Sequence, residues 1–289
     1  MSTLRLSDLV GGELKIQKEV KLTSGPVSVK IWLPRDSAKT LDAAKSLVQY
    51  EMGARHVKHL VIATDADETI IAATSRVRSD SQYLREISGS CTMIRDLLQE
   101  YTGRVDLGVI TARSAVDNDH AGLVAFCKQF LGVDPYVYMR SKEDDIEQDE
   151  HRWSSERSKS TYKTRNTRDL VNRVCEKNPG LQPSEVLVLR MGNLVSDWAD
   201  PEWCEDPVFC KSYISDKNDK ARVGIAINSE SGAREVLLQV GDIDSREQGM
   251  SVTFIESRPS VHHTDGLRHQ PSLSTLSGGS TCACVNGGS

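Results

Sequence analysis

The chain alternates short apolar runs with longer stretches in which apolar residues recur at helical spacing. The runs have the length and composition of strands that are buried on both faces of a parallel sheet. They lie at residues 60–63, 105–110, 136–139 and 186–189, and the helical stretches lie at 79–101, 115–131 and 163–174. This alternation predicts an α/β fold with a doubly wound (Rossmann-like) parallel sheet.

The segments before and after this pattern predict two further regions. Residues 1–55 predict a ββα extension, in which two strands joined by a turn precede a helix that ends near Met52. This unit is either a small prefix domain or an edge extension of the main sheet. The α/β domain is expected over 56–256, with additional edge strands at 223–227, 236–240 and 252–255. Apolar residues become sparse in 257–289, which predicts a disordered tail.

The end of this predicted tail has an unusual composition. Cys282 and Cys284 lie one residue apart among serine, threonine and glycine. Three interpretations stay open: a flexible end, a metal- or redox-active Cys-x-Cys, and the core of a peptide that is modified after synthesis behind a larger leader domain.

The net charge and the cysteine content limit which partners and which cellular compartment are expected. A net charge of −5 over 289 residues gives no global basic footprint for nucleic acid. No run approaches transmembrane length, and the N-terminus lacks the pattern of a signal peptide. Seven cysteines, most of them scattered through the body of the chain, are typical of reduced intracellular thiols. A cytoplasmic protein without a membrane partner is therefore expected.

Two aspartates directly follow the first apolar run. Asp65 and Asp67 are separated by one residue, which on an extended chain sends both side chains the same way. In open α/β sheets, ligands bind at the carboxyl ends of the strands. One carboxylate can attack as a nucleophile while its neighbour transfers a proton. Two close carboxylates also favour a cation with oxygen ligands, typically Mg²⁺.

The sequence from Asp65 to Thr69, Asp-x-Asp-x-Thr after a hydrophobic strand, resembles motif I of the haloacid dehalogenase (HAD) superfamily, whose members are mostly phosphohydrolases. The apolar strand that ends at Thr111 resembles motif II, whose hydroxyl can bind a phosphoryl oxygen. The helix that carries Lys163 resembles motif III, in which a lysine at the helix start offsets the charge of nucleophile and phosphate. Lys159 is the alternative lysine. The resemblance covers about residues 58–200.

The fourth HAD motif is commonly Gly-Asp-x-x-x-Asp after a strand, and supplies a metal-binding carboxylate. This chain has Gly192 and Asp197 at the expected spacing, but Asn193 replaces the first aspartate. Asparagine offers a neutral oxygen, so weaker metal binding or a larger share for Asp197 is expected.

A second turn competes for the role of motif IV. Gly241-Asp242 also follows a hydrophobic strand, and Lys220 would then be the motif III lysine, with residues 112–215 as a cap domain. Arg246 stands where the second aspartate of that turn would fall, which favours the first assignment.

The resemblance implies a Mg²⁺-dependent phosphohydrolase that cleaves phosphate monoesters through an aspartyl-phosphate. It implies catalytic roles for Asp65 (nucleophile), Asp67 (proton donor, then base), Thr111 and Lys163 (phosphoryl oxygens), and metal ligation by Asp65, Asp67, Asn193 and Asp197. The expected partner is a phosphorylated substrate, which an open site allows to be macromolecular, with nucleic acid only as a phosphorylated end. The alternative is a non-catalytic HAD-like domain that binds a ligand or, as a leader, presents the Cys-x-Cys peptide for modification.

Overall fold

A mixed sheet contains the eight strands of the described residues, in the order β1-β2-β7-β8-β6-β3-β4-β5. The five strands from β8 to β5 are parallel, whereas β1, β2 and β7 are joined through antiparallel pairs. In chain order the strands are β1 (Gln17–Lys21), β2 (Ser28–Trp32), β3 (His59–Thr64), β4 (Val105–Ser114), β5 (Tyr136–Arg140), β6 (Val186–Gly192), β7 (Arg222–Ala226) and β8 (Arg234–Gln239). The motif-bearing strands β3, β4 and β6 are thus neighbours.

This computed structural model describes residues 17–21, 28–32, 37–54, 56–72, 86–114, 119–141, 156–206, 222–226 and 231–240. The predicted strand at 252–255 and the predicted disordered tail at 257–289 lie outside these residues. So do the second candidate turn, Gly241-Asp242, and its lysine, Lys220.

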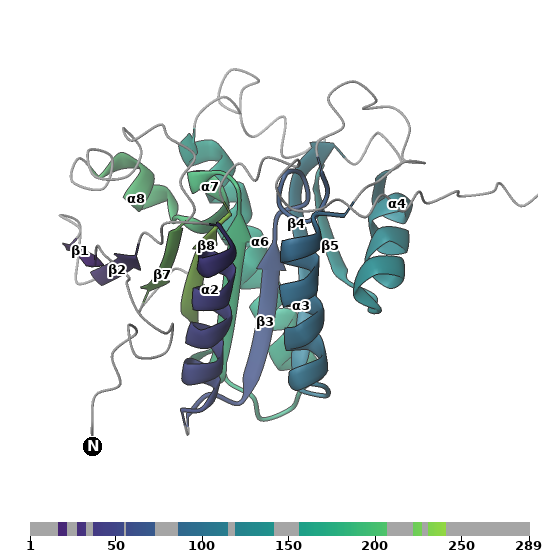
Figure 1. The fold of residues 1–289 in the computed structure, drawn as a ribbon, viewed down its shortest axis with the longest axis horizontal. Coiled ribbons are helices and arrows are strands. Elements are labelled where there is room, and N and C mark those ends of the chain that lie inside the picture. Colours follow the sequence, from purple (N-terminus) through teal and green to yellow (C-terminus); the bar gives the residue numbers. More distant parts are fainter. Residues whose placement is uncertain are drawn as a thin grey trace, which may run out of the picture. The chain divides into compact units, whose positions relative to one another are not determined.

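Helices cover both faces of the parallel part of the sheet (Figure 1). They are α2 (Ser37–Met52), α3 (Ser88–Glu100), α4 (Asp119–Phe126) with the π-helix η2 (Cys127–Leu131), α6 (Glu156–Lys177), and the short α7 (Val195–Trp198) and α8 (Pro201–Glu205). Leu60 and Ile62 of β3 belong to the core that includes α2 and α3, whereas Val61 and Ala63 belong to the core that includes α6. Successive side chains of a strand point to opposite faces, so one apolar run feeds two cores. The predicted doubly wound α/β class is confirmed.

The N-terminal strands continue this sheet. β1 pairs with β2, and β2 pairs with β7, which in turn pairs with the edge strand β8 of the parallel part. The ββα segment was interpreted as either a small prefix domain or an edge extension of the main sheet, and this strand pairing matches the edge extension.

Helix α3 is shorter than the helical periodicity predicts. The helix was expected to start at residue 79 or 80, but Ile87 is extended (φ −89°, ψ 99°) and α3 starts at Ser88. Glu86 makes an antiparallel bridge with Ile71, and the backbone N–H of Ile87 donates to Ile70 O at 2.9 Å. These contacts hold residues 86–87 in extended conformation beside the chain that follows β3.

Helix α6 begins earlier than predicted. Lys163 was expected at the helix start, but α6 begins at Glu156 and Lys163 lies about two turns inside it. Ser160, in one of these extra turns, is buried and donates to Ala199 O at 2.5 Å, so tertiary contacts hold this otherwise polar segment in the helix.

A close contact between β4 and α6 requires a glycine. A Cβ atom at Gly108 would lie 2.3 Å from Leu170 Cδ2, well inside van der Waals contact. The missing side chain therefore brings α6, which carries Lys163, close against the sheet.

Two of the composition-based expectations bear on the described residues. Cys91, Cys127 and Cys175 are free thiols. In the described part of the chain, no helix is both long and apolar enough to span a membrane.

Candidate active site

Strand β3 ends at Thr64, and the chain then turns tightly at the carboxyl edge of the sheet. The backbone N–H of Asp65 donates to Met191 O at 2.9 Å, which ties the first turn residue to β6. Ala66 O accepts hydrogen bonds from the N–H groups of Ile70 and Ile71, closing one compact turn. The side chain of Asp65 is only 10% exposed. A buried carboxylate at this edge needs a nearby cation.

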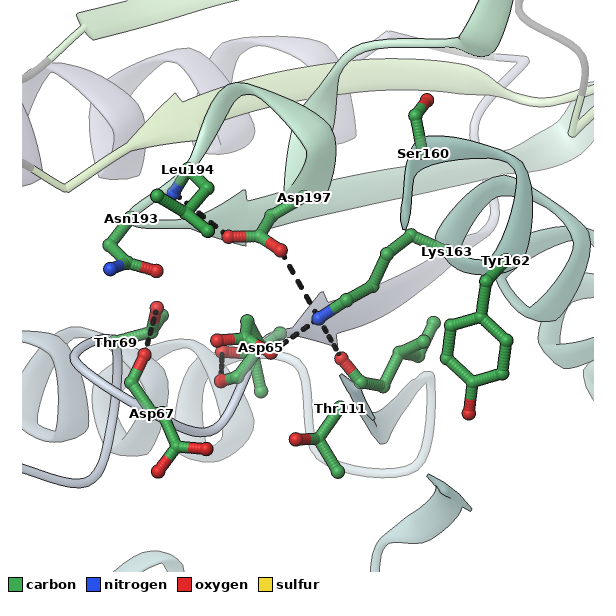
Figure 2. A network of polar contacts seen from close by, with 12 residues as sticks. Asp65, Asp67, Thr69, Thr111, Ser160, Tyr162, Lys163, Asn193, Leu194 and Asp197 are labelled. Atoms are coloured by element: carbon green, nitrogen blue, oxygen red, sulfur yellow. Dashed lines mark hydrogen bonds and ion pairs between the residues drawn. The ribbon is translucent and has the colours of Figure 1, made fainter. Parts of the chain in front are cut away.

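Lys163 supplies that cation. Its ammonium group donates to Asp65 Oδ1 and to Ile110 O, and lies 3.2 Å from Asp197 Oδ1 (Figure 2). The lysine side chain is 4% exposed and that of Asp197 is 5% exposed. Residues from β3, α6 and the segment after β6 therefore meet at one buried point. Lys159, the alternative lysine, lies one helical turn earlier in α6.

Two carboxylates share this single lysine, and burial affects the protonation of one of them, Asp65. Burial raises the pKa of Asp65 to about 7, because the attraction of Lys163 only partly offsets desolvation and the charges of Asp197 and Asp67. Burial alone would lower the pKa of Lys163, but the attraction of Asp197 and Asp65 outweighs it and raises that pKa above its ordinary value. The centre has one more negative than positive group when both carboxylates are ionised.

The position of Asp197 depends on the glycine that ends β6. A Cβ atom at Gly192 would lie 2.1 Å from Asp197 Cβ, so only glycine leaves room for this carboxylate. The backbone N–H of Leu194 donates to Asp197 Oδ2 at 2.9 Å and fixes the side chain at the first turn of α7. Asp197 thus accepts from the backbone N–H of Leu194 through Oδ2 and contacts Lys163 through Oδ1.

Arg190, which sequence reasoning treated as part of the turn after an apolar strand, lies within β6 and supports this loop from the interior. It is 1% exposed, and its Nε donates to Asp197 O at 2.9 Å. Its other nitrogens donate to Asp200 Oδ1 (2.7 Å) and Thr164 Oγ1 (2.7 Å), and Glu235 lies at 3.6 Å. Since Thr164 follows Lys163, one guanidinium joins the segment that carries Asp197 to the helix that carries the lysine. No spacing rule in the sequence singles it out.

Asn193 stands where the motif predicts a carboxylate, and the carboxylate of Glu68 lies next to it. Asn193 Nδ2 donates to Glu68 Oε2 at 2.8 Å, and Gln239 Nε2 donates to Asn193 O at 3.1 Å. Glu68 has a left-handed backbone (φ 56°), which is uncommon for a residue with a Cβ. The turn after β3 and the turn after β6 are joined through this pair.

Thr111 lies on β4, next to the carbonyl that Lys163 contacts, and is buried (1% exposed). Its Oγ1 accepts a hydrogen bond from the backbone N–H of Arg113 at 3.2 Å. In Figure 2 it lies below Lys163 on the side of Asp65. Its hydroxyl can in turn donate to an anionic oxygen.

Asp67 departs from the expected geometry. Alternation predicts that it points the same way as Asp65, but β3 has already ended and the chain is turning. Its carboxylate points away from Asp65 in Figure 2 and pairs with Arg113 through two hydrogen bonds, Nε to Oδ2 (2.9 Å) and Nη2 to Oδ1 (2.5 Å). Sequence reasoning assigned no role to Arg113, although a basic residue two positions after the threonine was a usable signal.

The donor set suits a hard divalent cation. Asp65, Asp197 and the amide oxygen of Asn193 offer oxygen ligands beside a centre with excess negative charge. Among the described residues no group of three or more His, Cys, Asp or Glu side chains is arranged to hold a metal. Mg²⁺ does not require such a group, because it is commonly held by one or two carboxylates, waters and substrate phosphate. The residues present therefore fit Mg²⁺.

The order of strands bears on the two candidate motif IV turns. β6 pairs directly with β3, whereas β8, which leads to Gly241-Asp242, pairs with β6 and β7. Asp197, from the first turn, contacts Lys163, and the second turn lies outside the described residues.

Comparison with protein-family models, with curated proteins and with solved structures finds no match.

Proposed function

We propose that this protein is a Mg²⁺-dependent phosphohydrolase of the HAD type, which cleaves phosphate monoesters through an aspartyl-phosphate. One observation carries the proposal: Asp65, Lys163 and Asp197 meet at the carboxyl edge of three neighbouring parallel strands, with Thr111 beside them. Phosphoryl transfer depends mostly on positioning and on stabilisation of charge, which a small set of this kind provides.

The first step is attack of an Asp65 oxygen on phosphorus, with cleavage of the bond to the leaving oxygen. Lys163 lies against Asp65 and reduces the repulsion between the carboxylate and a phosphate dianion. The Thr111 hydroxyl donates to a phosphoryl oxygen. The Asp67 carboxylate, which pairs with Arg113 in the free protein, turns toward the substrate, takes up a proton from solvent and gives that proton to the leaving oxygen.

The second step is hydrolysis of the acyl phosphate. Asp67 accepts a proton from water, the hydroxide oxygen attacks phosphorus, and Asp65 leaves as a carboxylate. Asp67 then loses its proton to solvent and pairs with Arg113 again, so the protein returns to its starting state. Mg²⁺, when bound by Asp65, Asp197 and Asn193, supplies positive charge for the phosphoryl oxygens. The two carboxylates that share Lys163 are then fully compensated.

The test is turnover of a generic aryl phosphate by the purified chain, with Mg²⁺ and with chelator. Activity should require Mg²⁺ and fall by about a thousandfold or more in Asp65→Asn. Asp96→Asn is a matched control, because Asp96 also pairs with a lysine, Lys45, but on the exposed side of α3. Activity that persists in Asp65→Asn or with chelator would contradict the proposal.

A specific observation also favours a non-catalytic HAD-like domain. Asn193, in place of a carboxylate, is bound to Glu68, and Asp67 is paired with Arg113, so two of the expected groups are engaged elsewhere. Such a domain would bind a ligand or present the Cys-x-Cys end for modification. Mass spectrometry that finds dehydrated or crosslinked tail residues, together with no turnover, would favour this function.

A further inference from the structure

The ion pair between Arg113 and Asp67 is the feature of the site that the proposed mechanism uses least. The guanidinium side chain is 24% exposed and the carboxylate is 45% exposed, so both groups are accessible from solvent. Nε and Nη2 of Arg113 each contact one carboxylate oxygen, a side-on fork geometry. The same fork matches two oxygens of a phosphoryl group, because carboxylate and phosphate present similarly spaced anionic oxygens.

The local structure of β4 directs Arg113 to this position. The pairing of β4 with β5 shifts register between Thr111 and Ser114, which is a β-bulge or a similar irregularity. Such features change the direction of side chains at the ends of strands. The Arg113 N–H also donates to Thr111 Oγ1, so the guanidinium and the threonine hydroxyl are fixed on one short segment.

We propose that Arg113 is a substrate-binding residue for the anionic phosphoryl group, and that Asp67 occupies its fork in the free protein and is displaced by the substrate. This inference rests on the proposed phosphohydrolase function and extends it. Displacement links two events that catalysis needs: the guanidinium binds the phosphoryl oxygens, and Asp67 is released toward the leaving group. Because a partly exposed ion pair contributes little stability, exchange of one anion for another costs little.

The test is binding of inorganic phosphate, measured by calorimetry with Mg²⁺ present, so that no turnover is required. Arg113→Gln should weaken phosphate binding at least about tenfold, since it removes two charge-assisted hydrogen bonds. Arg113→Lys should give an intermediate affinity, because it keeps the charge and loses the fork. Asp67→Asn should tighten binding severalfold, because it removes the competitor for the fork.

The double variant Asp67→Asn/Arg113→Gln separates competition from a general charge effect. If Asp67 competes for the fork, Asp67→Asn should tighten binding only when Arg113 is present. Equal tightening in the Arg113→Gln background would overturn the proposal. Arg173→Gln is the matched control, because Arg173 pairs with Asp169 farther along α6, and it should leave phosphate affinity unchanged.

The outcomes distinguish this inference from the proposed function. Phosphate binding that Arg113→Gln retains in full would overturn the role of Arg113 and leave the phosphohydrolase standing. Absence of phosphate binding in the wild type and in Asp67→Asn alike would overturn both. Binding that weakens in Arg113→Gln, with tightening by Asp67→Asn confined to the Arg113 background, would support both.

Discussion

Strand β3 begins at His59 and ends beside Asp65, and a polar cluster lies at each end. The two clusters differ in the number of donors available to each carboxylate. At the amino end, Asp106 accepts from His59 Nε2 and from Lys177 Nζ, both at 2.9 Å. These hydrogen bonds, chiefly that of His59, lower the pKa of Asp106 despite desolvation. At the carboxyl end, Asp65 and Asp197 share Lys163, and burial raises the pKa of Asp65 to about 7.

The two clusters differ in whether the negative charge of their carboxylates is balanced by the donors around them. Where one carboxylate has two donors, its charge is satisfied and nothing further is needed. Where two buried carboxylates share one cation, the folded protein retains unsatisfied negative charge, which a metal ion or a proton can neutralise. Perturbed carboxylates of the second kind are characteristic of functional sites.

Among the changes that test this comparison, the largest loss of stability is expected from Lys163→Met. Removal of the shared cation leaves two buried carboxylates facing each other, so unfolding by urea should show a loss of about 3–5 kcal/mol. Phosphatase activity should fall by about a hundredfold or more. The matched change at the other end, Lys177→Met, should leave activity near the wild-type value, because Asp106 keeps His59. Equal losses in the two variants would remove the distinction between the clusters.

Gly192→Ala should weaken Mg²⁺ binding as well as reduce the stability of the fold. The new Cβ would meet Asp197 Cβ, so the carboxylate must leave its place, and a loss of about 1–3 kcal/mol in stability is expected together with weaker Mg²⁺ binding. Gly108→Ala serves as the control, because its Cβ would also clash inside the core, with Leu170 Cδ2 at the end of a leucine side chain. It should reduce stability but spare Mg²⁺ affinity, as measured by calorimetry on both variants.

The pH dependence of stability should have opposite signs for the two carboxyls. Asp65 has a raised pKa in the folded protein, so between about pH 4 and 7 the folded state holds a proton that the unfolded state has lost. Its ionisation therefore costs stability as pH rises through that window. Asp106 has a lowered pKa, so it contributes stability above its unfolded pKa that is lost as pH falls through the folded pKa. Urea unfolding of the wild type, Asp65→Asn and Asp106→Asn in metal-free buffer across this pH range measures both contributions. If the two substitutions change the slope of the unfolding free energy against pH in the same direction, the expected difference in sign is wrong.

The smallest effect is expected from Asn193→Asp. A third carboxylate among the candidate Mg²⁺ ligands should strengthen Mg²⁺ binding by up to about tenfold, because hard cations prefer charged oxygen ligands. Repulsion from Glu68, which now accepts from the Asn193 amide, limits the gain. Asn193→Ala is the control and should weaken binding. If Asn193→Asp leaves Mg²⁺ affinity unchanged, residue 193 is not a ligand.

The sequence predicted the parallel strands and much of the site because both depend on local patterns. Runs such as 60–63 and 186–189 are apolar at every position, which is typical of strands covered on both faces. Asp65 and Thr111 follow such runs directly, so their place at the carboxyl edge comes from the chain order. Asp197 follows from its spacing to Gly192. The helix starts were less predictable, because Ile87 is held extended by a bridge between residues distant in sequence.

Other features depended on contacts that no local pattern encodes. Arg190 lies in a strand with an apolar pattern. Its burial is tolerated because the carboxylates of Glu235 and Asp200, the hydroxyl of Thr164 and two backbone carbonyls surround it in the folded chain. The alternation of Asp65 and Asp67 predicted a shared direction, but Arg113, which the irregularity in β4 places nearby, holds Asp67 instead. Chain order determines which residues reach the sheet edge. The packing of α6, β4 and β6 determines which carboxylate is buried, which one is paired with a cation, and where negative charge is left without a matching cation.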